Sequence, residues 1–570
     1  MSQENFRMVA KTFEGLEDVL RDELIDLGAE NVEMGNRMVS FEGNLEMLYK
    51  ANLCCRTALR ILKPIVMFTA DSTDELYDYL RDLDWEQFMD ANSTFAVDST
   101  VYGDEFSHSK FVTYRVKDAI VDHFRDKNGE RPSIRLEGAD LQLNVHIAGN
   151  RVTVSLDSSG EPLYKRGYRV EQTEAPINEV LAAGIILKTG WRGDSDFLDP
   201  MCGSGTFLIE AALIAGNINP GIYRESFAFE KWRDFDKDLF EELYNDDSEE
   251  KEFHYKIFGG DKDPDAIAVA RKNIKSARVE DMVELSCRPL TEWEADTAEG
   301  ILVTNPPYGE RLRPANLDGL YKEIGSTLKN NFQGWHAWII GYQDEQMKEI
   351  GLKPSVKIPL NNGKLECTLR EYVMFDGAYS QFRADGGTVA SEASEKRKAE
   401  GPRKVRHISD DDWKKESRKF NRENGMKEKS HGHVKGRADN RERDERNRTR
   451  DDFRARNEGR DQDGFRRKEG RDFKKKDNKP GGFKKYDGDF RRNDGDFRKK
   501  DRDFRKDDRE FGSGNREFRR DNRDFKDDKD RKRRTSGVVY DPKNSKGPKL
   551  PKDSETTINP VYFRKRKGNS

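Results

Sequence analysis

Apolar residues recur with regular periods over the first two thirds of the chain and predict alternating helices and strands. Leu16, Leu20 and Leu24 lie four residues apart, which is the spacing of one face of an amphipathic helix. By the same criteria helices are expected over 74–81 and 111–124, and strands over 37–42, 93–101, 142–147 and 151–156. This mixture predicts a compact α+β region from Phe6 to about Gly160, with helices on one face of a sheet.

The pattern changes after a helical run at 178–187. Short apolar strand cores are then each followed by a turn, and most of them by a helical pattern. The strand cores are 197–198, 256–258, 301–303 and 337–340, and the helices are 207–215, 265–277 and 317–330. This rhythm predicts an open, doubly wound α/β sheet, in which ligands bind outside the carboxyl ends of the strands.

Charge divides the chain into two unlike parts. Residues 1–390 hold 44 basic and 69 acidic side chains, whereas residues 391–570 hold 60 basic and 39 acidic ones, so the parts carry net charges of −25 and +21. The rear part has very few Leu, Ile or Val residues and cannot bury enough apolar surface to offset its chain entropy. We therefore expect a disordered, basic tail over 386–570.

Phenylalanine recurs in this tail every seven residues, at positions 483, 490, 497, 504, 511, 518 and 525. One apolar residue per heptad, with glycines in between, is too few for a coiled-coil seam. Interleaved aromatic and basic side chains suit base stacking and phosphate contact instead. We expect the tail to bind RNA non-specifically; a purely solubilising tail is the alternative.

The cysteines and the apolar segments exclude several classes of protein. The five cysteines form no C-x-x-C pair and have no His partners at ligand spacing, which argues against a disulfide framework and a metal site. The first residues lack the basic and apolar regions of a secretory signal, and the apolar run 180–187 is too short to span a membrane. We expect a cytoplasmic protein with no membrane partner.

A glycine-containing loop follows the first strand core of the α/β region. It reads Asp199-Pro200-Met201-Cys202-Gly203-Ser204-Gly205-Thr206 and opens the next helix. Glycines let backbone approach a ligand closely. The third glycine of a dinucleotide fingerprint is replaced by Leu208, and the chain has no P-loop, so a bound pyrophosphate is disfavoured. A tight turn without any ligand is the alternative for this motif taken alone.

The next strand core ends in Gly259-Gly260-Asp261-Lys262-Asp263. A carboxylate at the tip of this strand can accept hydrogen bonds from both hydroxyls of a ribose, and Asp261 is the better placed of the two aspartates. Asp263 is suited to cap the following helix, because Pro264 fits the first helical position. Together with the glycine loop, this predicts an adenosine-bearing cofactor that lacks phosphates.

Asn305-Pro306-Pro307-Tyr308 follows the strand core 301–303. The prolines stiffen the turn, so that the Asn305 side-chain oxygen and the Pro306 carbonyl can accept both hydrogens of an exocyclic amine. These contacts concentrate the lone pair on nitrogen, and Tyr308 offers a ring on which a base can stack. We interpret the four residues as a site that makes an amine reactive toward an activated methyl group; a plain Asx turn is the alternative.

DPMCGSGT, GGDKD and NPPYGERL resemble the methyl-donor loop, the ribose-binding acid and the target-amine motif of class I S-adenosylmethionine-dependent methyltransferases, specifically the guanine-N2 enzymes of large-subunit (23S) ribosomal RNA. The block from Leu156 to Ile185 is similar to the segment that closes over the cofactor in that family, and Asn361–Cys367 resembles its late hairpin. Residues 1–160 are similar to the family's ferredoxin-like and THUMP RNA-binding modules. The resemblance covers roughly 1–380.

The resemblance implies a domain order and a set of site residues. The domains are a ferredoxin-like module over 1–60, a THUMP domain over 61–160, a Rossmann-like methyltransferase domain over 161–385 and the tail. The implied cofactor is S-adenosylmethionine, held by Asp199, Pro200, Gly203, Ser204, Gly205, Thr206, Asp261 and Asp263. The implied catalytic residues are Asn305, Pro306, Pro307 and Tyr308, acting on a flipped guanine of ribosomal RNA. Phosphate contacts are expected from Lys110, Lys165, Arg166 and Arg169.

Two departures from the family pattern matter. The stretch 283–290, after the third strand, offers no obvious carboxylate for the adenine amine, so backbone groups are expected to contact the adenine. The chain also carries the charged tail where some members have a second methyltransferase. Three alternatives stay open: a transfer RNA guanine-N2 methyltransferase, an adenine-N6 enzyme, and a non-catalytic RNA chaperone or ribosome assembly factor.

Overall fold

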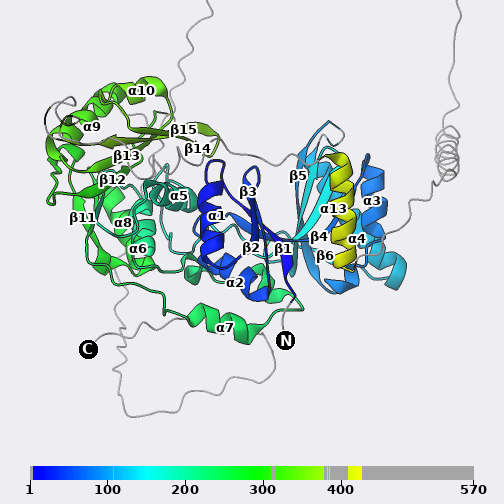
Figure 1. Cartoon of the computed structure of the whole chain (residues 1–570). Helices are drawn as coiled ribbons and strands as arrows, with labels where there is room; N and C mark the ends of the chain where they lie inside the picture. Colours follow the sequence, from blue (N-terminus) through cyan, green and yellow to red (C-terminus); the bar gives the residue numbers. More distant parts are fainter. Residues whose placement is uncertain are drawn as a thin grey trace, which may run out of the picture. The chain divides into compact units, whose positions relative to one another are not determined.

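The structure is a computed structural model of the whole chain (Figure 1). It describes residues 4–104, 106, 108–309, 316–375, 377, 382, 384 and 409–425. The phenylalanine repeat of the tail lies outside these residues. The described residues form two sheets, one with eight strands and one with seven. No helix among them is long and apolar enough to cross a membrane.

One strand joins the two N-terminal modules into a single sheet. The strand order is β2-β3-β1-β4-β8-β7-β5-β6, and β4 pairs with β1 on one side and with β8 on the other. The expected domain boundary at residue 60 therefore falls at the start of a strand that both modules share. The strands are β1 (Phe6–Lys11), β2 (Glu30–Met34), β3 (Met38–Gly43), β4 (Arg60–Thr69), β5 (Thr94–Tyr102), β6 (Ser133–Ile134), β7 (Leu141–Ala148) and β8 (Arg151–Asp157).

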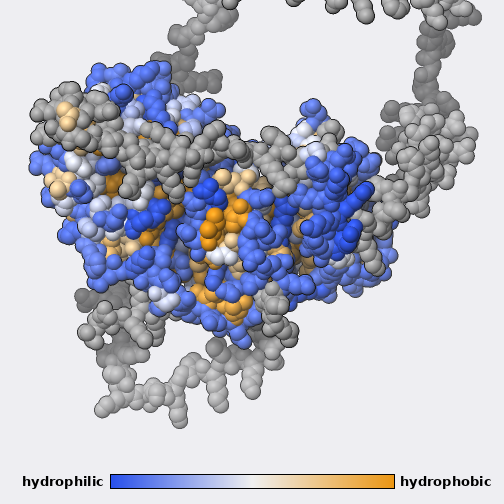
Figure 2. Space-filling view, viewed as in Figure 1, coloured by the Kyte–Doolittle hydropathy of each residue, from blue (hydrophilic) through white to orange (hydrophobic). Residues whose placement is uncertain are grey.

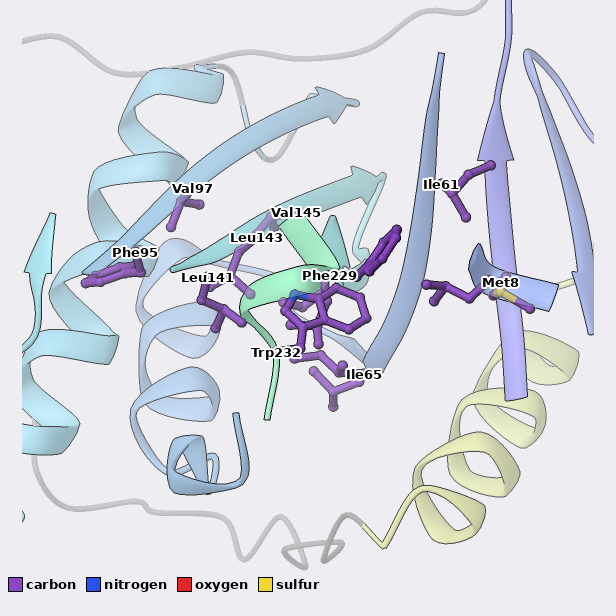
Figure 3. Packing of buried hydrophobic residues seen from close by; sticks show 14 of the residues in the cluster. Met8, Ile61, Ile65, Phe95, Val97, Leu141, Leu143, Val145, Phe229 and Trp232 are labelled. Carbon is purple, nitrogen blue, oxygen red and sulfur yellow. The ribbon is translucent and has the colours of Figure 1, made fainter. Parts of the chain in front are cut away.

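The core of this sheet contains aromatic residues from a much later part of the chain. Phe229 and Trp232 are buried in the same apolar cluster as Ile65 and Leu141, and Figure 3 shows them against the strands of this sheet. The Phe229 ring stacks on Tyr49, with 4.5 Å between the ring centroids. The segment around 227–244 thus belongs to the N-terminal core in space, although the sequence places it between two strands of the second sheet.

The second sheet has the order β11-β10-β9-β12-β13-β15-β14. Its first five strands are parallel, and β15, which pairs with β13 and β14, is antiparallel to both, so the predicted doubly wound α/β fold is confirmed with a mixed sheet. Strand order reverses between β9 and β12, which is where ligands bind in such sheets. The strands are β9 (Asp196–Asp199), β10 (Ile257–Asp261), β11 (Val283–Cys287), β12 (Gly300–Thr304), β13 (His336–Gly341), β14 (Val356–Asn362) and β15 (Leu365–Val373).

The helices cover both sheets and include all those that periodicity predicts. Leu20 and Leu24 of the first helix, and Leu16 immediately before it, are all fully buried, as their spacing implies. The described helices are α1 (Glu17–Asp26), α2 (Leu45–Cys54), α3 (Thr73–Arg81), α4 (Ser109–Asn128), α5 (Glu179–Thr189), α6 (Thr206–Ala215), α7 (Lys237–Asn245), α8 (Pro264–Ala277), α9 (Leu317–Asn331), α10 (Asp344–Lys348) and α13 (Asp410–Glu423). Short 3-10 turns lie at Trp85–Gln87, Pro220–Tyr223, Ala228–Lys231, Glu280–Met282 and Leu290–Glu292.

Helix α13 corrects one prediction. The sequence predicted no ordered structure after residue 386, yet Asp410–Glu423 is a helix that packs against β4 and begins with a Ser409 side-chain cap. Composition averaged over 180 residues hid this short amphipathic stretch, because its buried positions are few and mostly polar or aromatic rather than aliphatic.

Candidate functional site

The glycine loop and the NPPY turn lie at the carboxyl ends of neighbouring strands. β9 ends at Asp199 and β12 at Thr304, and the two strands pair in parallel. The Thr304 hydroxyl donates a hydrogen bond of 2.8 Å to Asp199 Oδ1, which also accepts from the Met201 amide at 3.2 Å. The side chains that the two motifs contribute thus meet at the reversal point of the sheet.

Asp199 is buried, and burial raises the pKa of its carboxyl to about 7. The hydrogen bonds from Thr304 and Met201 oppose this shift by stabilising the charged form. An acidic group with this pKa gains or loses its proton near neutrality. A nearby cation would favour its ionised form.

The glycine loop adopts a left-handed backbone at two positions. Gly203 has φ +51° and Gly205 has φ +79°. A Cβ on Gly205 would lie 3.2 Å from the Ala270 Cβ, whereas a Cβ on Gly203 would have its nearest neighbour, the Thr173 hydroxyl, at 3.6 Å. Gly205 is therefore required for packing against α8, and Gly203 leaves a backbone surface that a ligand can approach.

Asp261 joins the second strand end to this loop. Its Oδ2 accepts the Gly203 amide at 3.1 Å and its Oδ1 accepts the Asp263 amide at 3.0 Å. Burial raises the pKa of Asp261, and these backbone hydrogen bonds counter that effect. An ionised carboxylate can accept about four hydrogen bonds, so Asp261 retains capacity for two ribose hydroxyls. Asp263 caps α8 by accepting the Asp265 amide at 3.0 Å, as predicted, with Pro264 as the first helical residue.

Ser204 and Thr206 hold the preceding segment of the chain. The Ser204 hydroxyl accepts the Thr173 amide at 2.9 Å, and the Thr206 hydroxyl accepts from Arg169 Nη2 at 2.9 Å. Both residues are buried. Pro200, also buried, follows Asp199 at the end of β9. These contacts fasten the stretch around 169–173 over the glycine loop.

Asn273 on α8 is a part of this arrangement that sequence reasoning missed. It is buried, its side-chain oxygen accepts the amides of Val170 and Glu171, and its Nδ2 donates to the Ser204 carbonyl at 2.9 Å. A polar residue on the buried face of a predicted helix was the available signal. Asn273 ties α8, the glycine loop and the preceding segment together.

In the NPPY turn, the Tyr308 hydroxyl donates a short hydrogen bond to Asn305 Oδ1. A carbonyl oxygen has two lone pairs, so Asn305 can still accept one more hydrogen. Pro306 is buried, whereas Asn305, Pro307 and Tyr308 are half-buried. Burial raises the pKa of Tyr308, and Asn362 and Cys367 of the β14–β15 hairpin lie beside its hydroxyl. The Tyr308 hydroxyl thus holds the Asn305 side chain in place, a contact that the sequence did not predict.

Two of the four expected phosphate contacts pair with buried carboxylates instead. Arg166 is 2% exposed; its Nε faces Glu210 Oε1 at 3.4 Å and its Nη1 donates to the Leu163 carbonyl at 3.1 Å. Arg169 donates to Glu179 Oε1 at 2.7 Å. A phosphate contact needs a guanidinium that faces solvent, whereas the guanidinium groups of Arg166 and Arg169 bind partners within the protein. Lys110 and Lys165 are exposed and remain proposals.

The loop after β11 is where the sequence predicts that backbone groups contact the adenine of the cofactor. The Arg288 guanidinium lies 3.5 Å from the centroid of the Trp293 ring, and a Cβ on Gly260 would lie 2.6 Å from Trp293 Nε1. Glu284 in β11 pairs with Lys256.

The part of the chain that the structure describes holds no group of three or more His, Cys, Asp or Glu side chains able to bind a metal.

Comparison with family models finds three matches in the order expected. Residues 7–62 match the RlmL ferredoxin-like domain, residues 70–157 match the THUMP domain, and residues 166–371 match the RMKL-like methyltransferase domain. The matches end before α13.

Individual proteins extend this similarity. The chain is 36% identical over 364 residues to slr0064 of Synechocystis sp., named as a candidate RNA methyltransferase, and this covers 63% of the chain and 95% of slr0064. It is 40% identical over 382 residues to the ribosomal RNA large subunit methyltransferase K/L of Syntrophotalea carbinolica, covering 65% of the chain and 53% of that enzyme. The chain thus spans about half the length of the K/L relatives it matches.

Among solved structures, SMU.472, a candidate methyltransferase solved with SAH, superposes with a TM-score of 0.59 and 33% sequence identity. The similarity covers 66% of this chain and all of SMU.472.

Proposed function

The chain belongs to the family of RMKL-like methyltransferases that carry ferredoxin-like and THUMP domains, and from that premise we propose that it methylates the exocyclic N2 of a guanine in large-subunit ribosomal RNA, with S-adenosylmethionine as cofactor. The K/L relatives support the choice of ribosomal RNA, and the SAH of SMU.472 supports the choice of cofactor. The observation that carries the proposal is the hydrogen bond between Asp199 and Thr304, which holds the glycine loop beside the NPPY turn.

The residues of the loop fit this cofactor. Gly203 has the backbone geometry and the open space for close approach of a nucleoside, and Asp261 has lone pairs to spare for ribose hydroxyls. Asp199, with its pKa near neutrality, can meet a cationic group in its ionised form. When bound, S-adenosylmethionine supplies an activated methyl group on a sulfonium, which is a good leaving group, so catalysis depends chiefly on positioning.

The residues of the NPPY turn act on the amine. Asn305 Oδ1 and the Pro306 carbonyl accept the two amine hydrogens, while the adjacent Pro307 fixes the direction of the turn. Tyr308 donates to Asn305 and holds its amide in one orientation, and its ring stacks on the extruded base. The nitrogen lone pair is thereby directed at the methyl group instead of into the purine ring.

The test is incubation of the full chain with methyl-labelled S-adenosylmethionine and, separately, unmodified large-subunit ribosomal RNA and unmodified transfer RNA. Nucleoside analysis should find N2-methylguanosine in the ribosomal RNA. Label in N6-methyladenosine would overturn the choice of base, and label in transfer RNA alone would overturn the choice of substrate. Absence of label from both RNAs, with calorimetric binding of the cofactor, would favour a non-catalytic RNA-binding role.

A further inference from the structure

Helix α13 has one buried face and one basic face. The residues that turn inward follow the spacing of three and four that defines a helix face; they are Trp413, Glu416, Ser417, Phe420, Asn421 and Asn424. The exposed residues between them include five basic ones, namely Lys414, Lys415, Arg418, Lys419 and Arg422, whereas the exposed acidic ones, Asp411, Asp412 and Glu423, lie at the two ends of the helix. At 3.6 residues per turn these five lie within about 140° of the helix circumference.

The Asn421 side chain attaches the buried face of α13 to the backbone of β4, through two hydrogen bonds of the kind that a neighbouring strand would make. β4 pairs with β1 over Arg60–Leu62 and continues to Thr69. At Met67 the Asn421 side chain makes both hydrogen bonds of a ladder, accepting the Met67 amide at 3.0 Å and donating to the Met67 carbonyl at 2.7 Å. An open strand edge is a site of unwanted pairing, and this contact covers part of it.

Further contacts fix the helix to both N-terminal modules. Glu416 forms an ion pair with Arg7 of β1, and the Arg151 guanidinium at the start of β8 lies 5.7 Å from the centroid of the Trp413 ring. Phe420 is 7% exposed. The orientation of α13 is therefore set, and its basic face points away from the sheet. In Figure 2, the surface in this region is hydrophilic.

The basic face contrasts with the rest of the folded chain. Residues 1–390 carry a net charge of −25, which repels RNA at long range. The Lys415 and Lys419 side chains are 79% and 77% exposed, and their nearest acidic partners on the helix are 3.8 and 3.7 Å away. Exposed pairs of this kind are weak. These lysines are therefore able to exchange their partners for phosphates.

We propose that the basic face of α13 binds the phosphate backbone of the RNA substrate and so supplies the N-terminal modules with a positive surface. This inference rests on the proposed RNA substrate. Lys415, Lys419 and Arg422 lie about one helical turn apart, about 6 Å, so they form a row of charges that can follow successive phosphates. A membrane is disfavoured, because the face of α13 that would insert into lipid is already packed on β4.

The test uses the full chain with Lys415→Gln, Lys419→Gln and Arg422→Gln combined, since glutamine keeps helix propensity and removes charge. The matched control combines Lys322→Gln, Lys329→Gln and Lys348→Gln, three exposed lysines on α9 and α10. Affinity for a fluorescein-labelled RNA hairpin is measured against salt concentration. Three lost phosphate contacts should reduce the slope of log affinity against log salt by about 2–3, and the control should leave the slope unchanged.

An α13 variant with the wild-type slope would overturn the proposal. The same would follow if the control lowered the slope equally, because the loss would then reflect net charge alone. Cofactor binding by calorimetry should be unchanged in both variants. If the α13 variant shows the predicted change in slope but the wild type transfers no methyl group, the proposed catalysis fails while the proposed RNA contact of the basic face stands.

A second variant tests the anchor. Asn421→Ala removes both hydrogen bonds to Met67, so hydrogen exchange at the Met67 amide should become faster, and the salt slope should fall because the basic face is no longer held in place. Unchanged exchange at Met67 would show that α13 does not depend on this contact.

Discussion

The Thr304 hydroxyl donates to Asp199 Oδ1 across the reversal point of the second sheet, at 2.8 Å. This bond connects the last residues of β12 and β9, so the turn expected to hold the amine and the loop expected to hold the cofactor share one buried carboxyl group. Neither residue's role in this contact is visible from spacing, because the two lie 105 positions apart.

The pKa of Asp199 gives a prediction for stability against pH. Its folded pKa of about 7 lies above the ordinary value of 3.8, so the folded state binds the proton more tightly than the unfolded state. Protonated Asp199 therefore contributes at most about 4 kcal/mol to the free energy of unfolding. This contribution is fully present below pH 4 and is lost as the pH rises to about 7. Asp199→Asn should show a smaller fall in stability than the wild type between pH 5 and 8 in urea unfolding. Equal falls would contradict the assignment.

Asn305→Ala should lower kcat on the order of 10²–10³-fold, as expected for loss of one preorganised polar contact, with cofactor affinity unchanged. Single-turnover methyl transfer and calorimetry measure the two quantities. Near-normal turnover would remove Asn305 from the catalytic residues.

Tyr308→Phe tests the hydrogen-bond donor to Asn305. It keeps the ring for stacking but removes the hydroxyl that donates to Asn305. We expect a smaller loss of kcat than in Asn305→Ala, about fivefold, because one neutral hydrogen bond contributes about 1 kcal/mol. A loss as large as that of Asn305→Ala would mean that the orientation of Asn305 depends entirely on Tyr308.

Local pattern predicted the elements of the fold well, and long-range packing less well. The period of Leu16, Leu20 and Leu24 identified α1, and the strand–turn–helix rhythm identified the second sheet, because both depend on neighbours in sequence. The placement of Phe229 in the N-terminal core was not predictable, since no local signal says which of two cores an aromatic residue joins.

The site shows the same division. The helix cap at Asp263 follows from local geometry and was predicted. The burial of Arg166 was not, because its partner Glu210 lies 44 residues away, and a basic residue in a loop looks the same in sequence whether it faces solvent or a buried carboxylate.

The two glycines of the loop should respond differently to alanine. Both have positive φ, which costs an L-residue about 1–2 kcal/mol. Only Gly205→Ala adds a tight contact, at 3.2 Å from the Ala270 Cβ, so it should destabilise the protein by about 1 kcal/mol more than Gly203→Ala does. Thermal or urea unfolding of the two variants measures the difference, and a reversed order would contradict the described packing.

Arg166→Met should destabilise the fold by about 3–5 kcal/mol, because it leaves Glu210 buried without its partner charge. Burial already raises the pKa of Glu210. The matched control is Lys165→Met, whose exposed ion pair with Glu161 contributes at most about 1 kcal/mol. Denaturant unfolding measures both. Unchanged stability of Arg166→Met, with weakened RNA binding, would restore Arg166 as a phosphate contact.

Two truncations separate the tail from α13. A chain ending at Gly425 keeps α13 on β4, whereas a chain ending at Ala390 removes the helix and exposes the Met67 backbone groups that Asn421 pairs with. We expect the longer chain to retain the wild-type unfolding temperature, and the shorter one to unfold at a lower temperature and to aggregate through the open edge of β4.

Residues 426–570 carry 49 basic and 31 acidic side chains. Their removal alone should therefore reduce the salt dependence of RNA binding. If the slope of log affinity against log salt is unchanged in the chain ending at Gly425, phosphate binding by the tail is excluded. Equal stability of the two shortened chains would mean that α13 adds nothing to the stability of the fold.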